Sequence, residues 1–263
     1  TYKNWEVVFW DNQSSDSSAE KFKHYAKKDN RLKYFYANEH TLLYEARNLA
    51  IKKTKGEFIA ILDADDWWHP RKLEMQIPYF EDDQVGMVYA NYWLVQNNKK
   101  KIRYRRPLPH GEILQNLLKD YCIGMLTMVF RKSLVCQNNL LFNKEYQIIG
   151  DFDFALRLAD RKRISVVQKP LAYYRKHKDS LTEKELERPI IELQKWIRNS
   201  KLNRYQLTYI DYSFKRRMII KALYEKKYRK TIIYILTLDL GIRFKFKLLL
   251  LGLKIILYNN HFT

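Results

Sequence analysis

Short apolar runs alternate with helix-like segments over the first 66 residues, and this alternation constrains the fold more than any other feature of the chain. Between two of the runs, residues 41–54 place their apolar side chains at the spacing of one helix face. Strands and helices that alternate in this way favour βαβ units and a mostly parallel sheet. The sequence therefore predicts an α/β fold. The expected strands are residues 6–10, 32–36 and 57–62, and a first helix is expected to begin near Ser17.

Three carboxylates, those of Asp63, Asp65 and Asp66, follow the third expected strand. Open α/β sheets bind their ligands at the carboxyl ends of strands. Crowded carboxylates repel one another, and a hard divalent cation that carries phosphate oxygens would relieve this repulsion. The other interpretation is that Asp65 or Asp66 caps a helix whose first turn contains Pro70. The local sequence supports the two interpretations about equally.

Asp11 ends the first expected strand and opens a polar loop over residues 11–16. Such a loop is prone to turn and can cap the helix that begins near Ser17. When the loop is considered alone, this capping role is the favoured interpretation of Asp11. Arg47 lies beside the apolar face of the helix expected at residues 41–54.

A second acidic group, Asp151 and Asp153, stands at the start of another expected helix, where negative side chains suit the helix dipole. Two interpretations are open for this group: a simple cap with Asp153 in solvent, or a catalytic carboxylate. His177 lies farther along the chain. A single histidine is more often a surface or packing residue than a ligand.

The same patterns predict the remaining elements of the first 180 residues. A strand at residues 85–89 is expected to extend to residue 95, and a polar turn follows at residues 97–101. Residues 103–110 are expected to form a loop. The other expected elements are helices at residues 71–80 and 131–137 and strands at residues 126–130, 164–168 and 171–174.

The chain has 263 residues, of which 46% are hydrophobic, and this suffices for one large α/β domain with an appendage. Cys122 and Cys136 follow no metal or redox spacing, so a reducing compartment is the simplest expectation. No run of 18 uncharged apolar residues is present that could form a membrane span. These observations favour a cytoplasmic protein.

The net charge of +20 is distributed unevenly along the chain. Residues 185–263 contain 17 Lys and Arg against 6 Asp and Glu, so less than a third of the chain carries more than half of the excess. A basic tail of this kind binds a polyanion, either an anionic membrane surface or a nucleic acid. Nucleic acid is disfavoured, because none of the recognised nucleic-acid-binding motifs occurs.

Residues 231–258 combine basic and strongly apolar character. On a helical wheel, Arg243, Lys247 and Lys254 form one narrow stripe among mostly apolar residues. This pattern suits a helix that lies in a membrane interface, although a hairpin that packs its apolar face on the main domain is the alternative. Membrane contact is favoured, because charge and apolar character occur together. The predicted organisation is an α/β domain at residues 1–180 and a helical, basic, membrane-associating tail at residues 181–263.

Four segments, in this order, together resemble the motifs of family 2 glycosyltransferases, of the kind that build bacterial cell-surface polysaccharides. The second of them combines Ala46-Arg47-Asn48-Leu49-Ala50 with the Asp63-Ala64-Asp65-Asp66 string, and it is similar to the DxD region of that family. The resemblance extends over residues 1 to about 180 and does not include residues 185–263. The four segments are residues 1–16, residues 46–66, residues 151–158 and residues 174–177.

The resemblance implies a GT-A fold, Rossmann-like, and an inverting transfer from a nucleotide-diphosphate sugar to a hydroxyl of a glycan. It also implies Mn²⁺ or Mg²⁺ as the cofactor. The basic tail would place the site beside a lipid-linked acceptor, on the inner face of the cytoplasmic membrane. In this scheme Asp151 is the general base. Four residues would bind the donor: Asp11 would contact the nucleotide base, Arg47 would lie near the nucleotide, Asp63 would face the ribose and Asp65 would hold the metal. His177 would be a further metal or diphosphate ligand.

In one respect the sequence departs from this family. The family's domain normally begins with a strand and a helix that precede the segment matched by Thr1. We therefore expect an incomplete nucleotide pocket in the chain as given. The alternative function is a catalytically impaired module that binds a sugar nucleotide or a membrane.

Overall fold

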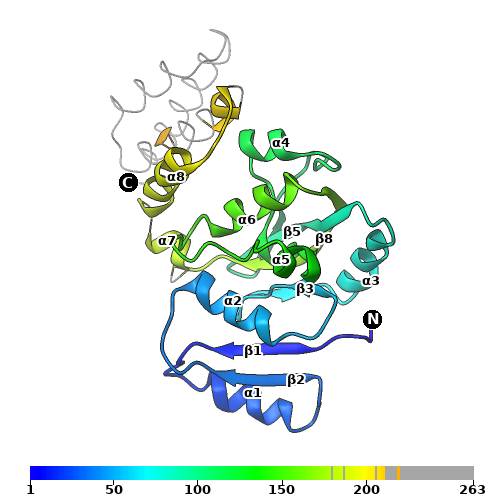
Figure 1. Cartoon of the computed structure of the whole chain (residues 1–263). Helices are drawn as coiled ribbons and strands as arrows, with labels where there is room; N and C mark the ends of the chain where they lie inside the picture. The colour runs from blue at the N-terminus through cyan, green and yellow to red at the C-terminus, as the bar shows by residue number, and fades with distance from the viewer. Residues whose placement is uncertain (179, 186, 205, 211–217, 220–263) are drawn as a thin grey trace. The chain divides into compact units, whose positions relative to one another are not determined.

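The computed structural model describes residues 1–178, 180–185, 187–204, 206–210 and 218–219. The chain divides into two compact units (Figure 1). The first unit comprises Thr1–Leu114 and Tyr121–Ser180, and the second comprises Gln115–Asp120 and Leu181–Thr263. The first unit is a mixed α/β structure and contains every candidate site residue.

The first unit begins with a parallel two-stranded sheet of β1 (Val7–Asp11) and β2 (Leu32–Tyr36). Helix α1 (Ser18–Ala26) connects the two strands and packs on them through Phe22, whose ring stacks on Phe9 at 4.4 Å. This βαβ unit confirms the strand–helix–strand prediction for the start of the chain. Helix α2 (Leu43–Lys53) follows and confirms the helix predicted at residues 41–54.

A six-stranded sheet forms the body of the first unit, in the order β3-β7-β5-β8-β4, with β6 paired to β5. Only β5 and β8 run parallel in this sheet, and the other four pairings are antiparallel. The prediction of a mostly parallel sheet is therefore wrong in this respect. The strands are β3 (Phe58–Ala60), β4 (Trp67–Trp68), β5 (Val85–Gln96), β6 (Lys99–Ile102), β7 (Val129–Arg131) and β8 (Arg163–Arg175).

The connection lengths explain part of this mixed pairing. Asn97 and Asn98 both adopt positive φ, 48° and 59°, which is the backbone of a two-residue hairpin turn. Such a turn can join only antiparallel strands, whereas a parallel pair needs a crossover. The crossover between β5 and β8 is long and contains helix α6 (Gly150–Ala159). The polar turn predicted at residues 97–101 is confirmed at Asn97 and Asn98.

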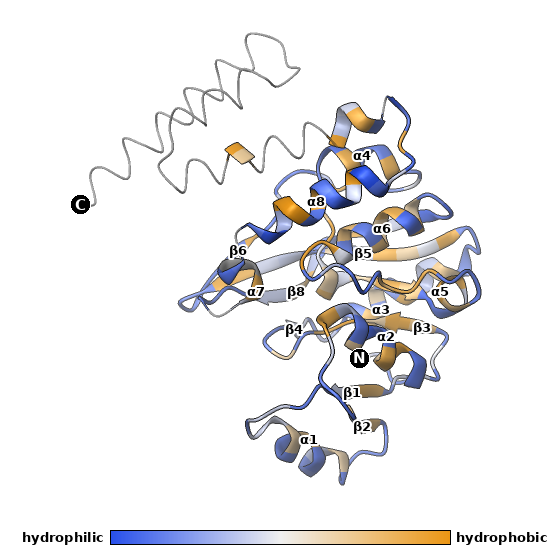
Figure 2. Ribbon diagram, turned by 60° about the vertical axis from the view of Figure 1, so that its left-hand side comes forward, coloured by the Kyte–Doolittle hydropathy of each residue, from blue (hydrophilic) through white to orange (hydrophobic). Residues whose placement is uncertain are grey.

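The core of the first unit lies between the central strands and α6. Residues 85–91 of β5 are all buried, as expected of a strand covered on both faces. Phe154 of α6 is fully buried and contacts Phe130 at 4.9 Å and Phe142 at 4.2 Å between ring centroids. The buried strands and α6 carry much of the hydrophobic colour in Figure 2.

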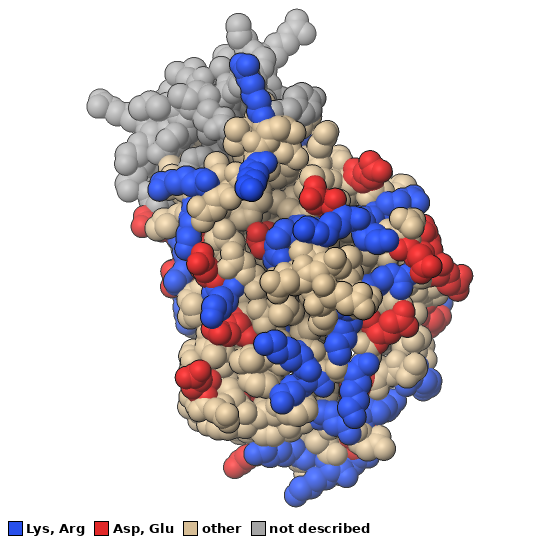
Figure 3. All heavy atoms as spheres, viewed as in Figure 1, with Lys and Arg blue, Asp and Glu red and all other residues tan. Residues whose placement is uncertain are grey.

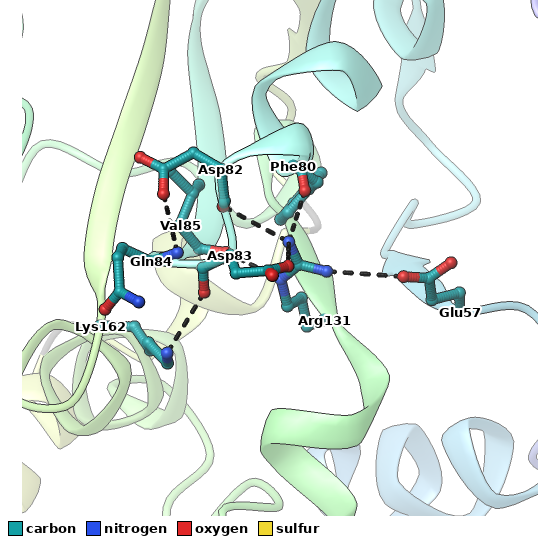
Figure 4. Close-up of polar contacts among 8 residues, drawn as sticks. All are labelled: Glu57, Phe80, Asp82, Asp83, Gln84, Val85, Arg131 and Lys162. Atoms are coloured by element: carbon teal, nitrogen blue, oxygen red, sulfur yellow. Dashed lines mark hydrogen bonds and ion pairs between the residues drawn. The ribbon is translucent and has the colours of Figure 1, made fainter.

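Arg131 of β7 fastens the connection that leads into β5 (Figure 4). Its Nε donates to the Val85 carbonyl at 3.0 Å, and its Nη2 donates to the carbonyl of Phe80. The guanidinium also lies 5.5 Å from the centroid of the Phe58 ring. Several backbone carbonyls are satisfied in this way by one cation, which fixes the start of the central strand.

Several predicted boundaries shift in the structure. The chain forms β4 directly after the acidic group, and helix α3 (Lys72–Gln76) begins only after Arg71. The interpretation of Asp65 or Asp66 as a cap of that helix is therefore wrong. A 3-10 helix, η1 (Ile77–Glu81), continues α3, and a second, η2 (Met125–Thr127), replaces the start of the strand predicted at 126–130. The two strands predicted at 164–168 and 171–174 are one strand, β8.

The remaining helices are short, apart from α8. The prediction of a helix at residues 131–137 is confirmed by α5, and residues 103–110 contain no helix or strand, as predicted. In the second unit, α8 lies within the tail predicted to be helical and buries Ile190, Leu193 and Trp196. These helices are α4 (Leu114–Lys119), α5 (Lys132–Gln137), α7 (Leu181–Lys184) and α8 (Arg188–Asn199).

Most of the predicted basic tail lies outside the described residues, including the whole of residues 231–258. The predicted membrane-interface helix therefore stays a prediction. Among the helices that the structure describes, none is long and apolar enough to cross a membrane.

Candidate functional site

The three clustered aspartates occupy a tight turn between β3 and β4. The backbone N–H of Asp66 donates to the carbonyl of Asp63 at 3.1 Å. The Asp63 carboxylate accepts a hydrogen bond from Arg47 of α2 at 2.6 Å. Only 11% of the Arg47 side chain is exposed, against 43% for Asp63. The structure thus joins two predicted donor-binding residues that are 16 positions apart, and the arginine of the pair is largely buried.

The end of β8 lies against the same turn. His177 Nε2 and Asp65 Oδ2 are 2.8 Å apart. The Arg175 N–H donates to Asp66 Oδ1 at 2.8 Å, and Arg175 Nε donates to the Asp65 carbonyl at 3.0 Å. The antiparallel pairing of β4 with β8 explains this meeting, because Trp67 stands opposite Tyr173 and the residues beyond each face one another.

One carboxyl of the acidic turn, that of Asp66, has a strongly shifted pKa. The pKa of Asp66 is raised to about 7, chiefly because burial disfavours its charged form, although the hydrogen bond from Arg175 opposes this. The neighbouring carboxylates of Asp65 and Asp63 raise it further. A divalent cation at the turn would favour the charged form of Asp66.

The donor atoms present also suit a partly protein-held metal. Within the described residues, no three His, Cys, Asp or Glu side chains are grouped as a complete metal site. Asp65 and His177 supply two adjacent donors. Mg²⁺ in nucleotide sites is commonly held by one or two carboxylates, with the other positions left to phosphate oxygens and water. The set fits Mg²⁺ or Mn²⁺ carried with a diphosphate.

Asp151 begins α6 in a polar setting made by two tyrosines. Its Oδ2 accepts a hydrogen bond from the Tyr121 hydroxyl at 3.3 Å. Its backbone N–H donates to the Tyr44 hydroxyl at 3.0 Å, and that hydroxyl lies 3.3 Å from the Ile148 carbonyl, to which it donates. Gly150 permits this contact, since a Cβ at that position would overlap the Tyr44 ring.

Asp153, by contrast, is a structural residue. It is 6% exposed and pairs with Arg157 one turn along α6 at 2.8 Å. The interpretation in which Asp153 lies in solvent is therefore wrong. Its pairing satisfies a buried charge and leaves Asp151 as the carboxylate of α6 that faces the tyrosines.

Tyr44 connects the two acidic groups. Its pKa is raised above the usual value, first because the hydroxyl is buried and next because of the charge of Asp151, while Asp63 adds a smaller effect in the same direction. The guanidinium of Arg47 opposes these effects and lies 5.1 Å from the centroid of the Tyr44 ring. Asp63, Arg47, Tyr44 and Asp151 therefore form one electrostatically coupled neighbourhood.

Asp11 lies at the end of β1 and is 1% exposed. Its carboxylate accepts hydrogen bonds from the Tyr34 hydroxyl at 2.5 Å and from the Ser14 N–H at 2.7 Å. Burial acts to raise its pKa, but these hydrogen bonds more than offset that effect, so the pKa is lowered and the carboxylate stays charged. Asp16, and not Asp11, accepts the N–H of Ser18 at the start of α1. Asp11 therefore does not cap α1. Its carboxylate instead stabilises the turn that contains Ser14.

The sequence did not single out Tyr44, Tyr121 or Arg175 individually. Tyr44 had a signal, because it stands three residues before Arg47 and so shares its helix face. Arg175 lies within the segment 174–177 but was given no role. Tyr121 lies outside regular secondary structure, where neither periodicity nor spacing marks a residue.

Known sequences match the part of the chain that contains the acidic turn. The model of Glycosyl transferase family 2 matches residues 1–136, just over half of the 263 residues. The chain is similar to the E. coli UDP-Glc:alpha-D-GlcNAc-diphosphoundecaprenol beta-1,3-glucosyltransferase WfgD, with 38% identity over 136 residues. That match covers 51% of this chain and 52% of WfgD, so the chain spans about half the length of this relative.

Two solved structures share the fold. The mannosyltransferase PcManGT from Pyrobaculum calidifontis, in complex with GDP-Man and Mn²⁺, has a TM-score of 0.63 at 17% identity, covering 96% of this chain and 71% of that chain. The S. aureus TarS 1–349 structure with UDP-GlcNAc has a TM-score of 0.54 at 19% identity, covering 95% and 63%. At such identities the likeness concerns the fold, which confirms the predicted GT-A architecture.

Proposed function

The chain belongs to Glycosyl transferase family 2, and from this premise we propose that it transfers a sugar, with inversion, from a nucleotide-diphosphate sugar to a hydroxyl of a glycan acceptor. The observation that best supports this proposal is the meeting of Asp65 with His177 across 112 residues of chain. An acidic turn held by cations from two distant segments is suited to a diphosphate and its counterion. A simple helix cap would need neither of them.

In the proposed donor site, Asp11 contacts the nucleotide base and Asp63 the ribose. Arg47 orients Asp63 through their 2.6 Å ion pair and lies near the nucleotide. Asp65 and His177 hold Mg²⁺ or Mn²⁺. When bound, the metal would act as a Lewis acid that stabilises the negative charge of the leaving diphosphate.

Asp151 is the proposed general base. As the acceptor oxygen attacks the anomeric carbon, its proton passes to the Asp151 carboxylate and the bond from that carbon to the diphosphate oxygen breaks. The products are the glycosylated acceptor and a nucleoside diphosphate. Tyr121 and Tyr44 fix the base: one donates to its Oδ2 and the other accepts its backbone N–H. Such proton removal is worth roughly 10²–10⁴-fold in rate.

The acceptor that we propose is a lipid-linked glycan in cell-surface polysaccharide synthesis. Support comes from the name of WfgD, which describes an acceptor sugar joined to undecaprenol through a diphosphate. The basic composition of residues 185–263 supports work at the anionic inner face of the cytoplasmic membrane. An electrostatic anchor of this kind needs no membrane-spanning helix.

A donor screen tests the proposal. The full chain is incubated with UDP- and GDP-sugars and Mn²⁺, and thermal shift reports binding. Release of nucleoside diphosphate in the presence of a lipid-linked acceptor reports transfer. We expect one donor to raise the melting temperature only when metal is present, and transfer to require the acceptor. A chain that binds a donor but never releases nucleoside diphosphate would support the alternative of an impaired binding module.

A further inference from the structure

One stretch of the chain has many cationic side chains and no carboxylates. From residue 84 to residue 111 the chain has no Asp or Glu, while its second half contains six Lys and Arg. These cations are spread over β6 and the loop that follows it, and all six are exposed. Figure 3 shows Lys and Arg scattered over one face of the molecule, with Asp and Glu among them. Charge of this kind is common on a basic protein, so the individual positions decide its meaning.

Arg103 and Arg106 both stand over the ring of Tyr104, and Arg103 is the nearer of the two. Its N–H donates to the Tyr92 carbonyl at 2.9 Å, and its guanidinium lies 5.2 Å from the centroid of the Tyr104 ring. Buried Asn91 holds the next residue, since its Nδ2 donates to the Tyr104 carbonyl at 2.7 Å. The loop is thus attached to the central strand where Arg103 emerges.

Tyr92 of β5 is an electrostatic neighbour of both Arg103 and Asp151, and of Tyr104. The rings of Tyr92 and Tyr104 meet edge to face at 6.2 Å. The Tyr92 ring also packs closely against Gly124, where a Cβ would come within 2.8 Å of the ring. Tyr92 and Tyr104 therefore connect Arg103 to the neighbourhood of Asp151.

The guanidinium of Arg103 has the setting of an anion-binding group. Among the described residues, no carboxylate forms an ion pair with it, and its surroundings are the two tyrosines. Desolvation acts to lower its pKa, but the charges and hydroxyls of Tyr92 and Tyr104 offset this, and the pKa is raised. A fully charged, exposed and preorganised guanidinium matches the geometry of phosphate oxygens.

We propose that Arg103, positioned by Tyr92 and Tyr104, binds the phosphate group that joins the acceptor sugar to its carrier. This inference rests on the proposed function and adds the group by which the acceptor is recognised. The base of the reaction lies beside Tyr92, and the acceptor's phosphate lies one sugar away from the hydroxyl that attacks. A contact of this kind would select carrier-linked sugars over free ones.

The test is a comparison of two acceptors that differ only in the phosphates. One is an alkyl diphosphate of N-acetylglucosamine, and the other is the neutral alkyl glycoside of the same sugar. We expect Arg103→Ala to raise the KM for the diphosphate about ten- to hundredfold, as for a lost hydrogen-bonded charge, and to leave the KM for the glycoside unchanged. An equal rise with both acceptors would overturn the proposal.

Arg105→Ala is the matched control. It removes the same charge from an exposed side chain two positions away, for which no contact with the tyrosines is seen in the described structure. We expect its KM for the diphosphate to rise less than threefold. If Arg105→Ala and Arg103→Ala have equal effects, general attraction by the basic loop explains them and a specific site at Arg103 is excluded.

A binding measurement separates this inference from the proposed reaction. Calorimetry with the alkyl diphosphate is done in EDTA, so that no metal-dependent binding at Asp65 contributes. We expect binding that Arg103→Ala weakens at least tenfold and that Asp65→Ala leaves unchanged. Such a result would support the phosphate site even if no donor is ever found. Absence of binding, or binding lost in Asp65→Ala alone, would overturn it.

Discussion

The acidic turn at Asp63–Asp66 and the acidic start of α6 contain the same chemical group in two different settings. In the turn, three carboxylates lie within four residues and are met by cations from α2 and from the end of β8. At the start of α6, Asp151 is surrounded by tyrosine hydroxyls, and its neighbour Asp153 is neutralised by Arg157. One setting concentrates negative charge, and the other places one carboxylate beside tyrosine hydroxyls.

The difference is the physical basis of the two roles proposed for this residue type. Crowding favours a cation at the turn, because the repulsion is relieved when positive charge enters. At the start of α6, the neighbouring tyrosines would hold the Asp151 carboxylate in place as it accepts a proton. Tyr44 lies between the two groups and touches the second through the Asp151 N–H. Substitutions in the turn should therefore affect donor binding, and substitutions at the start of α6 should affect the rate of transfer.

The largest expected effect comes from Asp151→Asn. The amide keeps the shape of the side chain but cannot accept the acceptor's proton, so kcat should fall by roughly 10²–10⁴-fold. Donor affinity should stay within a factor of about two, because the acidic turn is untouched. Steady-state transfer assays and thermal shift with donor and metal measure the two quantities. Full activity in this variant would show that another group is the base.

Asp153→Asn serves as the control for this first prediction. It breaks the buried pair with Arg157 and should lower the melting temperature without a comparable fall in kcat. If Asp153→Asn lost transfer as strongly as Asp151→Asn while remaining folded, the division between a base and a structural carboxylate in α6 would be wrong.

The second prediction concerns the turn. Asp65→Ala should weaken metal-dependent donor binding about ten- to hundredfold, because one of the two adjacent donors of the metal is lost. His177→Ala should also weaken metal-dependent donor binding, but by a smaller factor. Titration of the donor in Mn²⁺ and in EDTA measures this. The role of the turn would be disproved if wild type and Asp65→Ala bound the donor equally well under both conditions.

The third prediction tests the contact that brings the two groups together. A Cβ at Gly150 would overlap the Tyr44 ring, so Gly150→Ala forces the start of α6 away from α2. Overpacking of this kind typically costs about 1–3 kcal/mol. We expect a lower melting temperature and a fall in kcat larger than the change in donor affinity. Gly111→Ala is the contrasting variant. The φ of 86° at this position strains an alanine, but no atom lies within 4 Å of the added Cβ, so we expect kcat to stay unchanged.

The sequence predicted this site in part, for physical reasons that can be stated. The places of Asp63 after a strand and Asp151 at a helix start were predicted, because strand ends and helix starts are local patterns. Tyr121 was not singled out, because it lies outside regular secondary structure. Arg175 was not singled out, because β4 is only two residues long and its pairing with β8 depends on packing far away in sequence. The mixed sheet was missed for the same reason, since short strands carry no signal of their direction.

The smallest expected effect is a change in pH dependence at Asp66. Folding raises the pKa of this carboxyl from 3.8 to about 7, chiefly through burial. Between these values the native state holds a proton that the unfolded chain has lost, so stability falls as the pH rises from about 4 to about 7. Asp66→Asn removes this fall. In EDTA it should raise the melting temperature by a few degrees at pH 8, on the order of 1–2 kcal/mol, and change nothing at pH 4.

Asp29→Asn supplies the opposite sign and completes the comparison of carboxylates. Arg31 holds the pKa of Asp29 down to about 2, so its stabilising effect is present above pH 4 and is lost as the pH falls toward 2. This variant should therefore lose stability at pH 8, where Asp66→Asn gains it. Because only the crowded carboxylate should also respond to metal, added Mn²⁺ should reverse the advantage of Asp66→Asn and leave Asp29→Asn unaffected. An advantage that persisted in Mn²⁺ would mean that no cation enters the turn.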